Sequence, residues 1–213
     1  TQEGKRYGKV NTLVIADGEK QKPTAAAIRE SFAWFKQARE RDLCILFIAG
    51  HAVNDSGGNY YFLPADAAFD GSGVLDPRTA ISHREINAVL DMPGRKLFIL
   101  DTCHSAGAGK AGIADANSFI RQAMEYYPVI FSSSRGSEVS LEKEEYRHGL
   151  FTYSIIKGLE GSAVSPISGT ITMMSLNSYV SEIVSELSNG RQNPTTITPN
   201  GYVNFILAEP EKK

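Results

Sequence analysis

The hydrophobic pattern of this chain alternates between continuous apolar runs and segments with helical spacing. Two runs dominate it: Leu43–Ala49, with the sequence LCILFIA, and Lys96–Asp101, with the sequence KLFILD. Continuous runs of this length predict strands of a sheet that is covered on both faces. Further strands are expected over Val10–Ala16, Tyr60–Leu63, Val129–Ser132 and Tyr202–Leu207.

Segments with helical signals lie between these strands. A helix is expected from Thr24 to about Glu40, and a capping box of Ser82 and Glu85 predicts the start of another that ends near Leu90. Further helices are expected over residues 117–126, 149–159 and 172–188. Strands that alternate with helices predict an α/β fold with a mostly parallel central sheet flanked by helices.

Reactive side chains follow three of the predicted strands. His51 comes after the first long run, Cys103 comes after the second, and the run Ser132–Arg135 follows a third strand. In parallel sheets the carboxyl ends of the strands meet at one edge, where ligands bind. A thiol nucleophile needs a nearby base, so the pattern predicts a cysteine hydrolase with Cys103 as nucleophile and His51 as base.

The remaining histidines and the second cysteine fit this site less well. His104 follows Cys103 directly, and neighbours in an extended strand point to opposite sides, so it is a poor base for that sulfur. His83 and His148 are expected at the surface. Cys44 lies inside an apolar run, which is typical of a buried small hydrophobe.

Composition excludes several other classes of function. The chain has 213 residues, 42% of them hydrophobic, which is enough for the core of one domain. The formal net charge is −2 and there is no long basic run, so neither nucleic acid nor a membrane is expected as a partner. Two cysteines form no disulfide framework, which favours a cytoplasmic location. No metal site is expected, because the usual ligand spacings do not occur.

Asp101 lies two residues before Cys103, so both side chains can face the same way. Two roles are open for it. It could be a buried carboxylate that is satisfied by backbone N–H groups of the following loop. It could instead be the charged floor of a pocket for a basic substrate side chain. A negative charge would raise the pKa of a nearby thiol, which makes most sense where a substrate cation neutralises it.

The segments AGHAVNDSGGNYYFLPADA, LFILDTCHSAG and VIFSSSRGSEVSLE, followed by HGLFTYSIIKGLEG, resemble the caspase-like peptidase domain of bacteria. This is the metacaspase and orthocaspase branch of the caspase superfamily. The resemblance implies a caspase-hemoglobinase fold and a single domain over residues 1–213 with a core at about 10–207. It also implies hydrolysis of peptide bonds by a dyad of Cys103 and His51.

The resemblance further implies roles for the residues around the dyad. The oxyanion would be held by the backbone N–H groups of Cys103 and Ala52, and Ala49, Asp101 and Ser133 would bind the substrate. Metacaspases carry Asp two residues before the catalytic Cys and cleave after Arg or Lys, so Asp101 favours a basic P1 residue. Two positions differ from the family's usual pattern: Ala49 stands where Ser is common, and Ala52 stands where Gly is usual.

The same family normally opens with a central strand and a helix that do not occur before Val10. We therefore expect that the chain is truncated at its N-terminal side, or that an upstream segment or a partner chain completes the sheet. No cofactor is expected. Calcium activates part of the family, but Asp66, in a loop where an ion could bind, is one carboxylate and does not make a site.

Two alternatives to a peptidase remain at this stage. The chain could be a protease-like binding or scaffold module whose dyad is little used, or a redox-sensing protein with a reactive thiol at Cys103. Protein or peptide substrates are expected for a peptidase, and turnover of fluorogenic peptides separates the three classes.

Overall fold

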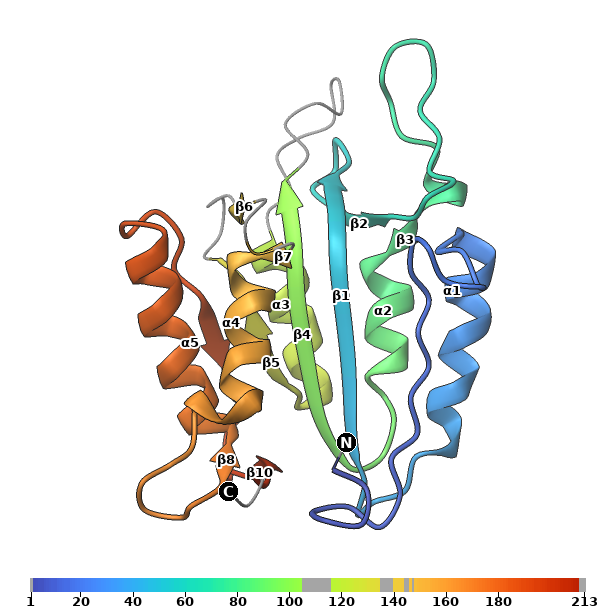
Figure 1. The fold of residues 1–213 in the computed structure, drawn as a ribbon. Coiled ribbons are helices and arrows are strands. Elements are labelled where there is room, and N and C mark those ends of the chain that lie inside the picture. The colour runs from blue at the N-terminus through green and yellow to red at the C-terminus, as the bar shows by residue number, and fades with distance from the viewer. Residues whose placement is uncertain (1, 105–115, 135–139, 144–145, 147, 211–213) are drawn as a thin grey trace. The chain divides into compact units, whose positions relative to one another are not determined.

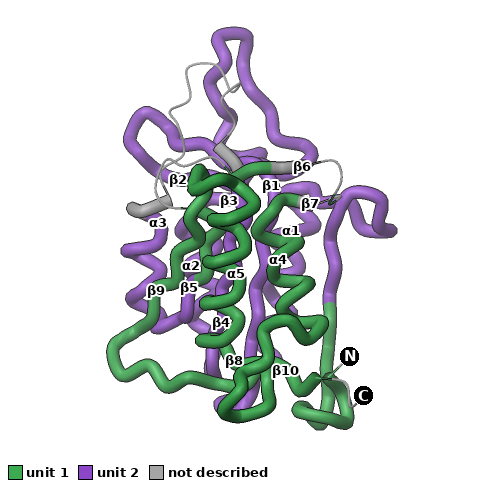
Figure 2. The backbone as a smooth tube through the Cα atoms, turned by 60° about the vertical axis from the view of Figure 1, so that its left-hand side comes forward, with its two compact units in different colours: residues 1–12, 131–213 green, residues 13–130 purple. Residues whose placement is uncertain are grey.

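The computed structural model of this protein describes residues 2–104, 116–134, 140–143, 146 and 148–210 (Figure 1). The chain divides into two compact units (Figure 2). One unit consists of residues 13–130, and the other consists of residues 1–12 and 131–213.

The unit of residues 13–130 is built on two long strands, β1 (Leu43–Asn54) and β4 (Arg95–His104). They run parallel and pair over ten residue pairs in one unbroken register, and they lie side by side in Figure 1. The apolar runs of the sequence therefore form the strands that were predicted from them, although both strands extend beyond the runs.

Two short strands continue the sheet on the other side of β1. β2 (Tyr60–Leu63) pairs antiparallel with the last four residues of β1, and β3 (Ile81–Ser82) pairs antiparallel with β2. The turn between β1 and β2 contains Gly58 with φ of 78°, a left-handed conformation that favours glycine. The strand predicted over Tyr60–Leu63 is confirmed, and it forms a hairpin with β1.

The helices of this unit begin at the predicted caps. Thr24 accepts a hydrogen bond from the backbone of Ala27, and Ser82 and Glu85 form the capping box that was predicted. The first helix is shorter than expected, because a 3₁₀ helix replaces its last turns. The helical elements are α1 (Ala25–Phe32), η1 (Ala33–Gln37), η2 (Pro77–Thr79), α2 (His83–Val89), α3 (Ala116–Ala123) and η3 (Met124–Tyr126).

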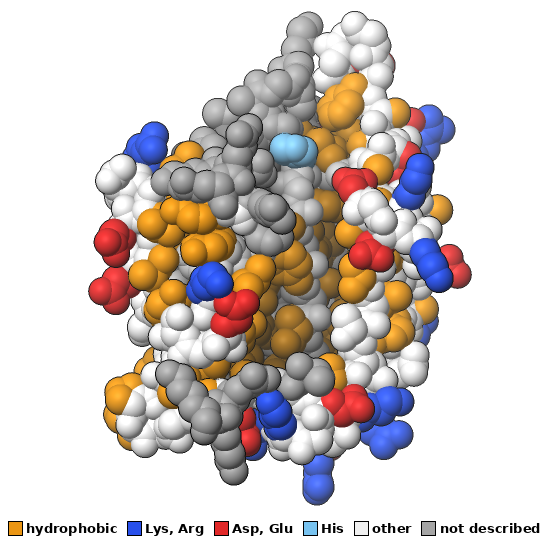
Figure 3. All heavy atoms as spheres, in the orientation of Figure 1, with side chains coloured by type: hydrophobic (Ala, Val, Ile, Leu, Met, Phe, Trp, Pro, Cys, Tyr) orange, Lys and Arg blue, Asp and Glu red, His pale blue; other side chains and the backbone are white. Residues whose placement is uncertain are grey.

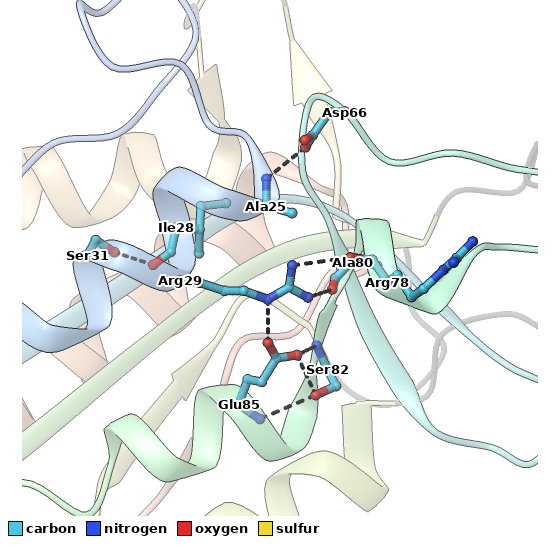
Figure 4. Close-up of polar contacts among 9 residues, drawn as sticks. All are labelled: Ala25, Ile28, Arg29, Ser31, Asp66, Arg78, Ala80, Ser82 and Glu85. Carbon is cyan, nitrogen blue, oxygen red and sulfur yellow. Dashed lines mark hydrogen bonds and ion pairs between the residues drawn. The ribbon is translucent and has the colours of Figure 1, made fainter.

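A cluster of polar contacts around Arg29 ties α1 to the start of α2 (Figure 4). The Arg29 guanidinium forms an ion pair with Glu85 at 2.6 Å and donates to the carbonyl oxygens of Ala80 at 2.7 Å and Arg78 at 3.2 Å. The second carboxylate oxygen of Glu85 accepts from the backbone and hydroxyl of Ser82. The Arg29 guanidinium therefore joins α1 to η2, to Ala80 after η2 and, through Glu85, to the N-cap of α2.

The second unit contains mostly helices and short strands. β5 (Val129–Ser132) crosses from one unit into the other. The other elements are β6 (Glu142–Lys143), β7 (His148–Gly149), α4 (Leu150–Lys157), the π-helical η5 (Gly158–Ser162), β8 (Ile171–Thr172), α5 (Met173–Leu187), β9 (Thr195–Ile197) and β10 (Ile206–Ala208).

The central sheet has six strands in the order β3-β2-β1-β4-β5-β9. It is mostly parallel and is flanked by helices, so the predicted α/β class is confirmed. The final strand was expected over Tyr202–Leu207. Only its last part forms a strand, β10, which pairs with β8 in a separate two-stranded sheet.

The strand predicted over Val10–Ala16 is wrong. These residues form no helix or strand, and Val10, Leu13 and Val14 are exposed to 39%, 43% and 54%. A strand needs a neighbour to pair its backbone groups. In the described part of the chain this segment pairs with no strand, so β-forming side chains alone do not produce one.

The expectation that the first apolar run is covered on both faces is also wrong. Along β1, Ile45 and Phe47 are exposed to 47% and 45%, whereas Cys44 is buried. Alternate residues of a strand lie on opposite faces, so one face of this part of β1 is covered and the other reaches the surface. Apolar side chains are visible at the surface in Figure 3.

Candidate active site

The parallel register of β1 and β4 brings the predicted catalytic positions side by side. His51 is the register partner of Cys103, and Ala49 is the register partner of Asp101. Neighbouring strands lie about 4.8 Å apart, and register partners and residues two apart share a face. The backbone thus places these four positions on one face of the sheet.

The sequence predicts that both reactive positions lie just after the ends of their strands. In the structure both lie inside the strands. β1 continues for three residues after His51, because β2 pairs with this part of it, and β4 continues to His104. The sequence placed the ends of both strands too early, because the small residues after each apolar run looked like strand breakers.

Gly50 gives β1 an unusual conformation directly before His51. Its φ is 146°, and a Cβ atom at this position would lie 3.0 Å from Cε2 and 3.3 Å from Cζ of the Phe62 ring on β2. Side chains of L-residues rarely adopt this φ, and the ring leaves little room for one. The His51 side chain that follows is exposed, so a substrate can reach it.

The residues around the reactive pair differ in burial. Asp101 and Thr102, the two residues before Cys103, are 7% and 8% exposed, and Ala52 is 1% exposed. Ala49 is exposed, like His51 two residues later. Burial of the Asp101 carboxylate is compatible with both roles that the sequence left open for it.

The opposite face of the ladder holds a buried aromatic and hydroxyl contact. The Tyr60 hydroxyl donates to Oγ1 of Thr102 at 3.0 Å, and the Tyr60 ring stacks on Phe119 with centroids 5.0 Å apart. Burial raises the pKa of the Tyr60 hydroxyl far above its ordinary value, although the hydrogen bond with Thr102 lowers it. This hydroxyl therefore stays protonated.

Comparison with known proteins decides the family. The family described as the caspase domain matches residues 12–201 of this chain. The chain belongs to the caspase domain family. This supports cysteine-type peptidase activity in general. The match extends over most of the chain.

A solved structure supports the same fold for this caspase domain. The crystal structure of protein GSU0716 from Geobacter sulfurreducens is similar to it with a TM-score of 0.53 and 14% identity. The similar region covers 83% of this chain and 74% of that chain. At this identity the likeness concerns the fold alone. None of the curated proteins searched matches the sequence.

Ser133, the remaining predicted substrate-binding residue, lies in the second unit of the caspase domain, directly after β5. It is 1% exposed, its hydroxyl lies 2.5 Å from that of Ser140, and its carbonyl oxygen accepts from Nε2 of Gln192 at 2.9 Å. Oε1 of Gln192 accepts from the backbone N–H of Leu141 at 2.8 Å. Arg135, at the end of this run, lies outside the described residues.

Sequence reasoning missed several buried residues that contact the predicted site residues or their neighbours in the chain. Nothing in the pattern marked Gln192, although it is fully buried and bonds two separate segments. Tyr60 and Phe62 were predicted only as members of a strand. Their alternation in the run YYFL was the available signal, because it places both on one face of β2.

The expectation that His83 lies at the surface is wrong. It is 5% exposed, because it shares with Ile86 and Asn87 the face of α2 that is buried. The side chains of His104 and His148 lie outside the described set. Cys44 is buried as predicted, and burial together with Asp42 raises the pKa of its thiol.

The structure gives Asp66 a structural contact. Its Oδ1 accepts a hydrogen bond of 2.7 Å from the backbone N–H of Ala25 at the start of α1 (Figure 4). Among the described residues, no group of three or more His, Cys, Asp or Glu side chains could hold a metal ion. The described helices also include none that is long and apolar enough to cross a membrane.

Proposed function

We propose that this caspase domain is a cysteine endopeptidase of the metacaspase and orthocaspase branch, which hydrolyses peptide bonds after Arg or Lys. The observation that carries the proposal is the register of β1 and β4. It pairs His51 with Cys103 and, one step along the same face, Ala49 with Asp101.

In the proposed mechanism, His51 takes the proton from the Cys103 thiol and the thiolate attacks the carbonyl carbon of the scissile bond. Backbone N–H groups of Cys103 and Ala52 hold the oxyanion. The intermediate collapses to a thioester, and His51 returns the proton to the leaving amine. His51 then deprotonates a water molecule that attacks the thioester, which releases the new carboxyl terminus and restores the thiol.

Asp101 supplies the proposed preference for a basic P1 residue. Its carboxylate is buried two residues before the nucleophile and shares a face of the strand with it. A bound Arg or Lys would place its positive charge next to this carboxylate, and a charge pair of this kind is strong where water is excluded. The exposed Ala49 beside Asp101 leaves room for the substrate. Ser133 stays a predicted substrate-binding residue.

Hydrolysis of fluorogenic peptides that end in Arg, Lys or Asp tests this proposal. We expect turnover of the Arg and Lys peptides, and we expect Cys103→Ala and His51→Ala to abolish it. Turnover of the Asp peptide alone would contradict the role of Asp101. Absence of turnover would favour a binding or scaffold module. Reversible oxidation of Cys103 without turnover would favour a redox-sensing thiol.

We also propose that a further strand completes the sheet beside β1, supplied by an upstream segment or by a partner chain. Among the described residues, β1 has β4 on one side from Leu43 to Ala52, but β2 pairs with it only from His51 onward. The open part carries the exposed Ile45 and Phe47. An open strand edge with apolar side chains favours pairing with another strand.

We place the enzyme in the cytoplasm, with protein or peptide substrates and no cofactor. A peptidase that uses a thiolate needs Cys103 to remain reduced, and a reducing compartment provides this condition.

A further inference from the structure

One strand, β2, contacts both strands of the candidate site at the residue that precedes each reactive position. The Tyr60 hydroxyl bonds Thr102, which precedes Cys103 on β4, at 3.0 Å. The Phe62 ring lies against Gly50, which precedes His51 on β1, where a Cβ would be only 3.0 Å away.

The register explains how a strand at one side of β1 reaches β4 on the other. Gly50 and Ala52 lie on one face of β1, with Phe62 opposite Ala52 and Thr102 opposite Gly50. Because Gly50 and Ala52 have almost no side chains, the tyrosine can cross above β1 on this face and meet Thr102. The reactive positions occupy the opposite face.

We propose that Tyr60 and Phe62 are positioning residues for the peptidase reaction: Tyr60 fixes the backbone before Cys103, and Phe62 fixes the backbone before His51. This inference rests on the proposed function. Neither residue touches the reacting atoms. Together they set the relative placement of nucleophile and base from the face of the sheet that is opposite to the reactive positions.

The contacts around Tyr60 suit a rigid support. Its side chain is 1% exposed and stacks on Phe119. The Phe119 ring in turn packs against Phe98 in a T-shaped arrangement, with ring centroids 5.5 Å apart. The hydroxyl is held between this buried aromatic group and Thr102, itself 8% exposed. A buried hydroxyl pair has few alternative partners, so the bond constrains the position of β4.

The experiment compares Tyr60→Phe, Thr102→Val and the double variant with the wild-type chain. Tyr60→Phe keeps the ring and removes only the hydroxyl. We expect kcat for the Arg peptide to fall about tenfold with KM unchanged, as loss of one buried hydrogen bond suggests. The double variant should lose no more than either single variant, because all three remove the same bond.

Two controls separate positioning from general loss of structure. Thr102→Ser keeps a hydroxyl acceptor and should retain most of the wild-type kcat. Tyr127→Phe makes the same chemical change at a tyrosine that is 70% exposed and should leave kcat unchanged. The folded fraction of every variant is measured by thermal unfolding, and activity is expressed per folded molecule.

A second measurement does not depend on peptidase activity. The rate of alkylation of Cys103 against pH, followed by peptide mapping, reports how well the thiol is paired with its base. We expect the wild-type midpoint to lie below the free-thiol value of about 8.5 and Tyr60→Phe to move it towards that value.

The two measurements distinguish the inference from the proposed function. If no peptide is cleaved but Tyr60→Phe shifts the alkylation profile, the proposed function fails and the positioning role stands. If wild type cleaves the Arg peptide while Tyr60→Phe and Thr102→Val leave kcat and the alkylation profile unchanged, the positioning role is wrong.

Discussion

At the scale of single residues, the charge of Asp101 decides the substrate preference that we propose. We expect Asp101→Asn to lower kcat/KM for the Arg peptide by about 100-fold, because a desolvated charge pair contributes about 3 kcal/mol. Steady-state kinetics with Arg and neutral peptides checks this. Asp91→Asn, a change at an exposed carboxylate, is the control. An unchanged preference for Arg in Asp101→Asn would contradict the role of this carboxylate.

The sequence predicted the strands next to the reactive positions better than the contacts between them. Cys103 and His51 are catalytic candidates because each follows an apolar run, and both runs form strands. Their direct pairing in the sheet could not be predicted, since the register depends on contacts between segments far apart in the chain. His83 was misjudged for a related reason: the pattern around a helix start does not reveal which side of its first turn meets the core.

At the scale of elements, the ion pair of Arg29 and Glu85 joins α1 to α2. Burial alone would raise the pKa of Glu85, but hydrogen bonds from Arg29 and Ser82 outweigh it and hold the pKa below its ordinary value of 4.5. A lowered pKa in the folded state means that the pair stabilises above pH 4.5 and that this contribution is lost as the pH falls through the folded-state pKa.

We therefore expect Glu85→Gln to lower the free energy of unfolding at neutral pH by about 1 kcal/mol or less, since solvent screens this half-buried pair. At a pH below the folded-state pKa the difference from wild type should be smaller, because the wild-type carboxyl is then largely protonated. Urea denaturation at both pH values measures it. Glu30→Gln, at an exposed position of α1, should show no such pH dependence. An equal effect of Glu85→Gln at both values would argue against an ionic contribution.

The side-chain amide of Gln192 links two segments of the second unit through hydrogen bonds to the Ser133 carbonyl and the Leu141 N–H. We expect Gln192→Ala to lower the free energy of unfolding by about 2–4 kcal/mol, because the Ser133 carbonyl and the Leu141 N–H lose their partners. Thermal or chemical unfolding tests this, with Gln37→Ala at the exposed end of η1 as the matched change. A variant as stable as wild type would show that water replaces both bonds.

Elements could be predicted from sequence where their signals were local. The capping box at Ser82 and Glu85 and the hairpin strand Tyr60–Leu63 need only neighbouring residues, and both form. Val10–Ala16 has the composition of a strand but has no described partner, so the pattern failed there. A segment forms a strand only where another strand pairs with its backbone, and the sequence of the segment alone does not reveal this.

At the scale of the whole molecule, the open edge of β1 predicts self-association. We expect the chain to form dimers or larger species as its concentration rises, and Phe47→Lys to shift it towards monomer, since a charge on an open strand opposes pairing. Light scattering after size-exclusion chromatography measures this. Val74→Lys, at another residue that is 50% exposed, is the control. A monomer at every concentration would mean that this edge does not pair with a second copy of the chain.

The central claim is that Cys103 is the nucleophile of a peptidase that recognises basic residues. Its most direct test is reaction with irreversible peptidyl inhibitors that end in Arg or Asp, followed by mass spectrometry of the intact chain and its peptides. We predict one adduct of the Arg inhibitor on Cys103, none on the buried Cys44, and loss of labelling in His51→Ala. Labelling at Cys44, no labelling, or preference for the Asp inhibitor would contradict the claim.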